Sequence, residues 1–193
     1  MSQRRVIVIG MGSSLFSNAE SDHAESAAWA REKLNSKEWV ILDTETTGLS
    51  TKTSRVVEVA VLDPAGNVLL DTLVNPEIEI PEGARKIHGI SNFDVIDSPT
   101  IAGIWPDLLA VVENRLVLCY NVNYDRPLLE NEAARGDLQP IDSIWQCVML
   151  RYAAYVGEPG FGGYRYQKLP SAGHRAKDDC LATIELIHKM ATL

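Results

Sequence analysis

The spacing of apolar residues along the chain predicts that three consecutive strands open the domain. A continuous apolar run over 39–43 is typical of a central buried strand, and residues 55–63 alternate as a second strand does. Residues 63–67, Asp-Pro-Ala-Gly-Asn, have strong turn chemistry. Residues 67–74 are therefore expected to return as the hairpin partner of the second strand.

Helices and two further strands are expected after this hairpin. In chain order they are short helical pieces around 82–87, a helix over 101–113, a buried strand over 115–120, a helix that Asn123 can cap, a short fifth strand that Asp142 closes, and helices over 147–155 and 179–190. Residues 157–173 hold Gly, Pro and Tyr without a clear period. This segment is expected to form a loop beside a functional site.

The first 37 residues are expected to stand apart from the domain at 38–193. They comprise a tail or edge strand and then a short helix, with Asp22 as a possible N-cap. Arg4 and Arg5 precede a short apolar run, but glycines break that run and no convincing cleavage site follows, so secretion is not expected. A lone GxG at 10–12 is weak support for a dinucleotide fold.

Composition restricts the class of protein. A chain of 193 residues with 46% hydrophobic content suits one globular domain. The net charge of -8 argues against a protein that grips long nucleic acids by charge alone, but it does not exclude an enzyme acting on nucleic acid. Three cysteines without CxxC spacing favour a reduced, cytoplasmic setting. No apolar run reaches the roughly 18 residues that cross a bilayer, so no membrane contact is expected.

Two carboxylates stand one residue apart at the end of the predicted central strand, in the sequence LDTETTGL at 42–49. In an extended chain alternate side chains share a face, so Asp43 and Glu45 project side by side. Burying two neighbouring anions without a partner costs several kcal/mol or forces one to take up a proton. A divalent metal removes this conflict, and an acidic strand end open to water is the simpler alternative.

Two further acids are expected to reach the same strand ends. Asp125 lies near the start of a helix that follows a buried strand, and Asp179 lies near the start of the last helix. Four carboxylates suit Mg²⁺ or Mn²⁺, which prefer oxygen ligands. His174 precedes Asp179 by five residues. A histidine titrates near neutrality, so this side chain can take a proton from a metal-bound water.

These motifs together resemble the DEDD superfamily of 3′-to-5′ exonucleases, in its DEDDh branch, which includes the proofreading subunit of bacterial replicative DNA polymerase. The resemblance covers residues from about 39 to 190. The matching segments are LDTETTGL at 42–49, IHGI at 87–90, YNVNYD at 120–125 and HRAKDD at 174–179.

The resemblance implies an α/β architecture of the RNase H-like type, with a five-stranded mixed sheet flanked by helices. It also implies hydrolysis of a terminal phosphodiester with two Mg²⁺ or Mn²⁺ ions about 4 Å apart. In that scheme Asp43 bridges both ions, Glu45 and Asp179 serve the ion that holds the attacking water, and Asp125 helps the other. His174 is then the general base.

The resemblance further implies that the turn after the strand receives the terminal nucleotide. The expected substrate contacts are Thr46, Leu49, His88, Tyr120, Asn121 and Tyr124. For His88, a hydrogen bond that fixes a turn is favoured over a role in catalysis. Asp178 is expected to lie beside the ligands or in solvent rather than to bind metal.

The chain departs from the family pattern at two places. Cys119-Tyr120-Asn121 stand where many relatives have Gly-His-Asn, and the segment before the third motif is compact. Residues 151–177 carry five basic residues against Glu158 alone, a local net charge of +4. They also hold the rings Tyr155, Phe161, Tyr164 and Tyr166. Charge and rings together are typical of a track for a single nucleic-acid strand, and packing explains the rings equally well.

Two classes of function follow. The favoured one is a metal-dependent exonuclease that trims the 3′ end of DNA or RNA to release nucleoside monophosphates, with single strands as the expected substrate. The rival is a binding or assembly module on the same fold, inactive alone and attached to a polymerase or processing complex. The presence of all four acids and the histidine favours the enzyme.

Overall fold

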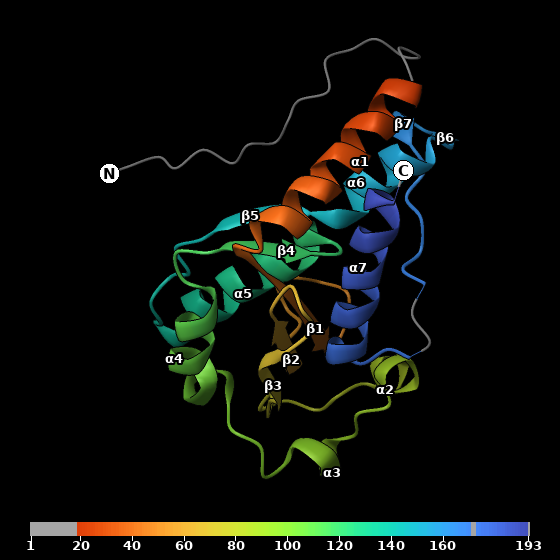
Figure 1. The fold of residues 1–193 in the computed structure, drawn as a ribbon. Helices are drawn as coiled ribbons and strands as arrows, with labels where there is room; N and C mark the ends of the chain where they lie inside the picture. Colours follow the sequence, from red (N-terminus) through yellow and green to blue (C-terminus); the bar gives the residue numbers. More distant parts are fainter. Residues whose placement is uncertain (1–18, 171–172, 193) are drawn as a thin grey trace.

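A five-stranded mixed sheet forms the centre of the computed structural model, which describes residues 19–170 and 173–192 (Figure 1). The strands are β1 (Trp39–Thr46), β2 (Val56–Leu62), β3 (Val68–Leu73), β4 (Leu116–Cys119) and β5 (Ile144–Cys147). Their order in the sheet is β3-β2-β1-β4-β5. β2 pairs antiparallel with β1 and β3, whereas β4 lies parallel to β1 and β5. The predicted central strand is confirmed.

The hairpin between β2 and β3 forms at the predicted turn. Asp63 Oδ1 accepts hydrogen bonds from the backbone N–H groups of Ala65 at 2.8 Å and Asn67 at 2.9 Å. Gly66 adopts a φ of 84°, which a glycine tolerates without strain. β2 departs from the expected alternation because all of its residues are buried, including Glu58. Helices cover both faces of the sheet here, so neither set of side chains reaches water.

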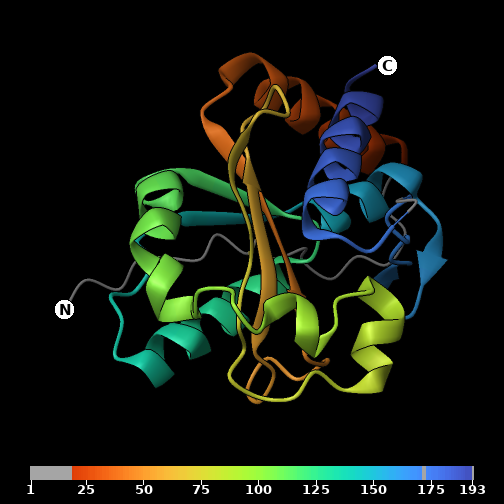
Figure 2. The same cartoon turned by 90° about the horizontal axis from the view of Figure 1, so that it is seen from below.

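The helices are α1 (Ala19–Ser36), α2 (Glu82–His88), α3 (Asn92–Val95), α4 (Ile101–Val112), α5 (Val122–Gly136), α6 (Val148–Val156) and α7 (Ala176–Ala191). Figure 2 shows the sheet between two helical layers, with α4 and α5 on one face and α1, α6 and α7 on the other. Leu108 and Leu128 fill the first interface, and Trp29 and Ile187 fill the second. Each layer thus buries one face of β1.

α1 belongs to the second of these cores. Trp29 packs in the same cluster as Trp39 and Leu186, and the helix runs against α6 and α7. It begins at Ala19, so Asp22 lies inside its first turn and is not the N-cap. The predicted tail or edge strand lies outside the described residues, and the division at residue 38 stays a prediction. Within the described part of the chain, no helix has both the length and the apolar character needed to span a bilayer.

Three other boundaries differ from the sequence prediction. α5 begins at Val122 with Asn121 as its N-cap, so Asn123 lies within the first turn. Asp142 does not close the fifth strand but precedes it, because the ladder with β4 starts at Ile144. α7 begins at Ala176, three residues before the predicted start, which places Asp179 in its first turn.

The three cysteines are free and buried, as expected of small core residues. Cys119 lies at the end of β4 and Cys180 on the inner face of α7. Burial raises the pKa of both thiols, which keeps them protonated.

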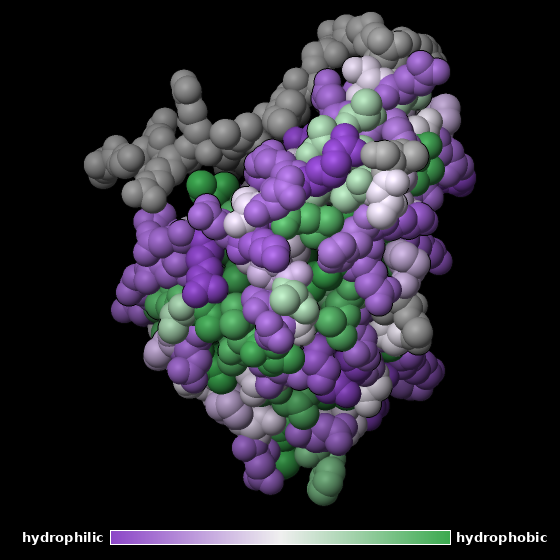
Figure 3. All heavy atoms as spheres, in the orientation of Figure 1, coloured by the Kyte–Doolittle hydropathy of each residue, from purple (hydrophilic) through white to green (hydrophobic). Residues whose placement is uncertain are grey.

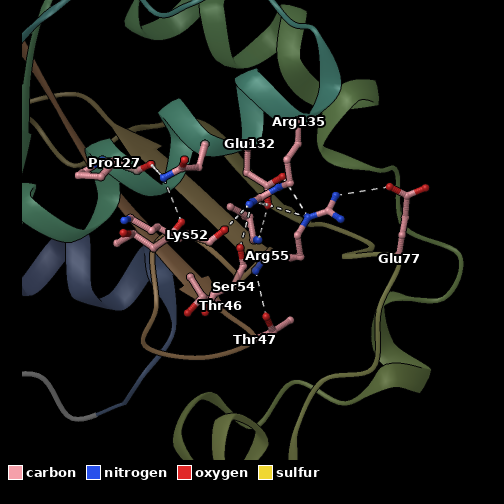
Figure 4. A network of polar contacts seen from close by, with 12 residues as sticks. Thr46, Thr47, Lys52, Ser54, Arg55, Glu77, Pro127, Glu132 and Arg135 are labelled. Carbon is pink, nitrogen blue, oxygen red and sulfur yellow. Dashed lines mark hydrogen bonds and ion pairs between the residues drawn. The ribbon is translucent and has the colours of Figure 1, made fainter.

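A buried carboxylate ties α5 to the loop that follows β1 (Figure 4). Glu132, 1% exposed, accepts hydrogen bonds from Arg55 Nε at 3.0 and 3.1 Å and from the N–H of Val56 at 3.1 Å. Arg135 Nη2 lies 3.2 Å from the same carboxylate and donates to the Ser54 carbonyl. We call Glu132, Arg55 and Arg135 the Glu132 clamp. It holds residues 50–56 against α5.

Replacing Glu132 with Ala is expected to lower the free energy of unfolding by about 3–5 kcal/mol, because it removes the buried carboxylate that two partly buried guanidinium groups share. Arg55 would keep only its ion pair with exposed Glu77 at 3.5 Å. Urea denaturation measures this loss. The matched control is Glu130→Ala on the same helix, which breaks an exposed ion pair with Arg126. That change is expected to cost no more than about 1 kcal/mol. Equal losses in the two variants would contradict a structural role for the clamp.

Candidate active site

An open pocket of about 190 Å³ lies where β1 ends, and the acids from all three motifs meet in it. Its lining residues are Asp43, Thr44, Glu45, Tyr120, Asn121, Tyr124, Asp125, Leu169, His174 and Asp179. β1 supplies the first two acids, α5 supplies Asp125 and α7 supplies Asp179. The structure therefore brings together all five residues predicted to be catalytic.

The carboxylates are close enough to share a cation. Asp43, Glu45 and Asp179 each offer an oxygen, and these oxygens all lie within 4.8 Å of one another. Asp125 lines the same pocket, is 4% exposed and accepts a hydrogen bond from Thr44 Oγ1 at 2.8 Å. This bond from the strand fixes the orientation of Asp125 in the first turn of α5.

Crowding and burial make the ionised state of this cluster costly. Burial is the main cause that raises the pKa of Asp43 well above its usual range, and the charges of Asp125 and Glu45 add to it. The pKa of Glu45 is raised to about 8 by burial and by Asp179, and the pKa of Asp125 is raised to about 7 by burial. A hard divalent cation would favour the ionised forms, so the donor set fits Mg²⁺ or Mn²⁺.

His174 lies in the irregular segment directly before α7. Its side chain is exposed and lines the pocket that holds the four acids. A ring at the mouth of the pocket can exchange protons with solvent and with a group bound inside. Asp178 is exposed on α7 and does not line the pocket.

The predicted substrate contacts divide into two groups. Tyr120, Asn121 and Tyr124 line the pocket, whereas the other three lie outside its lining. Thr46 is nevertheless joined to the pocket wall, because its hydroxyl lies 2.6 Å from that of Tyr124. Both hydroxyls also bond the Gly48 carbonyl, which fixes the turn after β1.

Leu49 and His88 differ sharply in exposure. Leu49 is 88% exposed at the tip of this turn and so presents an apolar side chain to solvent. His88 is 5% exposed, and its Nδ1 accepts a hydrogen bond from the N–H of Ile90 at 3.0 Å. Burial lowers the pKa of His88, which favours the neutral ring that such a bond requires. Its ring fixes the turn at the end of α2.

Glu58 is a residue near the site that the sequence patterns did not single out. It pairs across the sheet with Glu45, is 2% exposed, and accepts hydrogen bonds from Arg175 Nε at 3.0 Å and from the N–H of Ala176 at 2.9 Å. It thereby fixes the start of α7 between His174 and Asp179. A charged residue in the apolar run VVEVAVL was the available signal.

The basic residues of 151–177 do not form one loop. Arg151 lies on α6, where its guanidinium stands over the ring of Trp29. Arg175 pairs with Glu58, and Lys177 lies 3.1 Å from Asp71. Arg165 pairs with Glu158 at 2.7 Å, so four of the five cations of this segment contact other groups of the protein. The segment therefore does not present its positive charge as one basic track.

Replacing Glu45 with Gln is expected to make stability less dependent on pH when cations are removed with EDTA. The pKa of Glu45 rises from 4.5 to about 8 on folding. Its ionisation therefore costs the folded wild type progressively more stability as pH rises from 4.5 to 8. Urea unfolding of both proteins should show the variant gaining on the wild type across this range. Mg²⁺ at pH 8 should stabilise the wild type more than the variant.

Parallel pH profiles of the two proteins in EDTA would show that Glu45 ionises in the folded state without cost. A response to Mg²⁺ of equal size in both would remove Glu45 from the proposed ligands.

Comparisons with known proteins give concordant matches. The family model described as RNase_T exonuclease matches residues 40–187. The chain is 34% identical over 174 residues to an uncharacterized exonuclease CP81 of Escherichia phage 186, covering 79% of this chain and 87% of that protein. It is 30% identical to the DNA polymerase III subunit epsilon of Treponema pallidum, covering 77% and 74%.

Among solved structures, exonuclease X in complex with 5′ overhanging duplex DNA matches with a TM-score of 0.56 and 27% identity. That match covers 80% of this chain and 92% of the other.

Proposed function

This chain belongs to the RNase T family of exonucleases, and we propose that it removes nucleotides one at a time from the 3′ end of DNA or RNA strands. Membership of the family makes it a nuclease. The observation that carries the finer proposal is the meeting of four carboxylates and His174 in one pocket. Such a set is more than nucleic-acid binding requires, because anions repel a phosphate backbone unless cations lie between them.

Asp43, Glu45, Asp125 and Asp179 are the proposed ligands of divalent cations. Their crowding and raised pKa values are relieved when cations bind, which supports this assignment. Bound Mg²⁺ or Mn²⁺ supplies charge stabilisation at the scissile phosphate and an acidified water. Thr44 holds Asp125 in place, and Glu58 holds the start of α7 that carries Asp179.

His174 is the proposed general base. It lies at the pocket mouth, where an imidazole nitrogen can accept the proton of the attacking water and release it to solvent. The terminal nucleotide is proposed to rest on the turn after β1. There Thr46 and Tyr124 fix the backbone, and exposed Leu49 offers an apolar contact to a base.

The 3′-to-5′ direction is what the resemblance to the DEDDh branch implies, and likeness to named proteins supports the wider assignment to exonucleases. DNA polymerase III subunit epsilon and exonuclease X are similar to this chain over most of its length. The first of these is by name a polymerase subunit, which supports a polymerase or processing complex as a partner. An inactive assembly module would have no need to maintain a destabilising acid cluster, so the enzyme is favoured over that alternative.

An oligonucleotide labelled at its 5′ end tests the proposal directly. With Mg²⁺ or Mn²⁺ the wild type should produce a descending ladder of labelled products and release mononucleotides. A circular single strand should stay intact because it offers no end. Cuts in the circle, or a label released at once as a mononucleotide, would contradict 3′-to-5′ trimming.

Asp43→Asn should lower this activity by several orders of magnitude while the protein stays folded. The amide removes one charge from the cluster, so stability in EDTA should rise or stay the same. The matched control is Asp107→Asn on the exposed side of α4, which should keep full activity. A folded Asp43→Asn protein with near-normal rates would refute the assignment of the pocket.

His174→Ala should lower the single-turnover rate at neutral pH by about 10²- to 10⁴-fold without abolishing metal binding, because the carboxylates remain. The deficit should shrink as pH rises, since hydroxide then needs no base. Rates measured against pH at saturating metal decide the matter. Profiles of the same shape for both proteins would assign His174 to ordering the segment before α7.

A further inference from the structure

A small hairpin between α6 and α7 holds an exposed aromatic ring at its tip. Its strands are β6 (Pro159–Gly160) and β7 (Gly163–Tyr164), and Phe161 lies in the turn, fully exposed. In Figures 1 and 2 the hairpin lies at the outer edge of the molecule, on the side of α7. We call residues 158–168 the aromatic hairpin.

The base of the aromatic hairpin is fixed. The side chain of Glu158 accepts hydrogen bonds from Arg165 Nη1 at 2.7 Å and Gln167 Nε2 at 3.0 Å, and its carbonyl accepts one from the N–H of Arg165. Tyr164 donates its hydroxyl proton to Asp22 on α1 at 2.6 Å. At Gly160 a Cβ would lie 2.9 Å from the backbone of Arg165, so only glycine permits this close crossing. The tip is therefore held out from the body.

The rings near the hairpin divide by their surroundings. Tyr155 stacks on His23 with ring centroids 4.2 Å apart, and Tyr164 is bonded to α1. Phe161 and Tyr166 remain exposed, the latter by 60%. Lys168 is also exposed, so apolar rings and a cation follow each other along one segment.

The aromatic hairpin continues into the wall of the active-site pocket. Tyr120 lines the pocket and donates its hydroxyl proton to the carbonyl of Gln167 at 2.5 Å. Leu169, two residues further on, lines the pocket itself. Tyr166 and Lys168 are direct sequence neighbours of Gln167 and Leu169 and are both exposed. Phe161 is five residues from Tyr166 and so lies at most about 17 Å from it.

We propose that the aromatic hairpin binds the single strand that leads away from the nucleotide in the pocket, with Phe161 and Tyr166 stacking on bases and Lys168 contacting phosphate. This proposal rests on the proposed exonuclease function. Stacking on a protein ring is tolerant of sequence and strengthens binding by about 5- to 150-fold per base. At about 3.4 Å per stacked nucleotide, a backbone separation of at most about 17 Å corresponds to no more than roughly five nucleotides.

Affinity for oligothymidylates of different length tests this directly. Fluorescence anisotropy with Ca²⁺ in place of Mg²⁺, which keeps cations between the acids and the strand while slowing hydrolysis, gives the Kd of wild type, Phe161→Ala and Phe93→Ala for dT3 and dT12. Phe161→Ala should raise the Kd for dT12 by about 5- to 150-fold and leave that for dT3 unchanged. Phe93, 86% exposed on α3 at the other end of the molecule in Figure 1, is the matched control and should change neither.

Phe161→Trp provides the rescue. It keeps a stacking ring, so it should retain wild-type affinity for dT12, and its indole fluorescence should be quenched when dT12 binds but not when dT3 binds. A Phe161→Ala protein that binds dT12 as tightly as the wild type overturns the proposal. The proposal is also overturned if Phe161→Ala weakens binding of a blunt duplex as much as binding of dT12, because paired bases cannot stack on the ring.

The outcome separates this proposal from the proposed function. If the wild type trims labelled strands and the Phe161→Ala variant binds and trims dT12 equally well, the proposed role of the hairpin is refuted and the proposed exonuclease function stands. If the wild type neither binds nor trims any strand, both the proposed role of the hairpin and the proposed exonuclease function are refuted.

Discussion

Electrostatic repulsion among the carboxylates at the end of β1 is the constraint around which the rest of the structure is organised. Asp43, Glu45 and Asp179 offer oxygens within 4.8 Å of one another. Among the described residues, Arg175 offsets the charge of Glu45 only in part, because its guanidinium is bonded to Glu58. Burial then makes each charge more costly, as the raised pKa values of Asp43 and Glu45 show. A chain folds into such an arrangement only where other contacts stabilise the elements that carry the acids.

Those contacts are buried polar networks on either side of the pocket. Glu58 fixes the first turn of α7 through Arg175 and the N–H of Ala176, and the Glu132 clamp fixes the loop after β1. Thr44 adds a direct bond to Asp125. Removing one partner from a buried network costs far more than removing an exposed ion pair, so these networks resist displacement. The acids therefore keep their positions although they repel one another, which is the preorganisation that metal-assisted hydrolysis requires.

The sheet and the pocket could be predicted because their signals are local. An apolar run followed directly by acids marks the end of β1. The spacing of apolar residues in the two later helices likewise places Asp125 and Asp179 near helix starts. Glu58 could not be predicted, because a polar residue in an alternating strand normally faces water, and its partner Arg175 is 117 residues away. Predicted element boundaries were wrong where strand pairing sets them. The fifth strand begins at Ile144, where its pairing with β4 begins, and Asp142 lies in the connection before it.

The distribution of charge also explains how an acidic protein can act on a polyanion. Most of the local cations that the sequence offered for a phosphate track are used inside the protein, as Arg175 and Lys177 show. Besides exposed Lys168, attraction of the strand must then come from cations held by the acid cluster and from uncharged contacts to the bases. Aromatic rings supply these uncharged contacts, because stacking acts on bases and is not opposed by net negative charge. A strand threaded past Phe161 and Tyr166 would reach the acids only at its end. Selectivity for termini would then follow from this arrangement, because only the end of a strand would lie in the pocket where cations can be held between the acids.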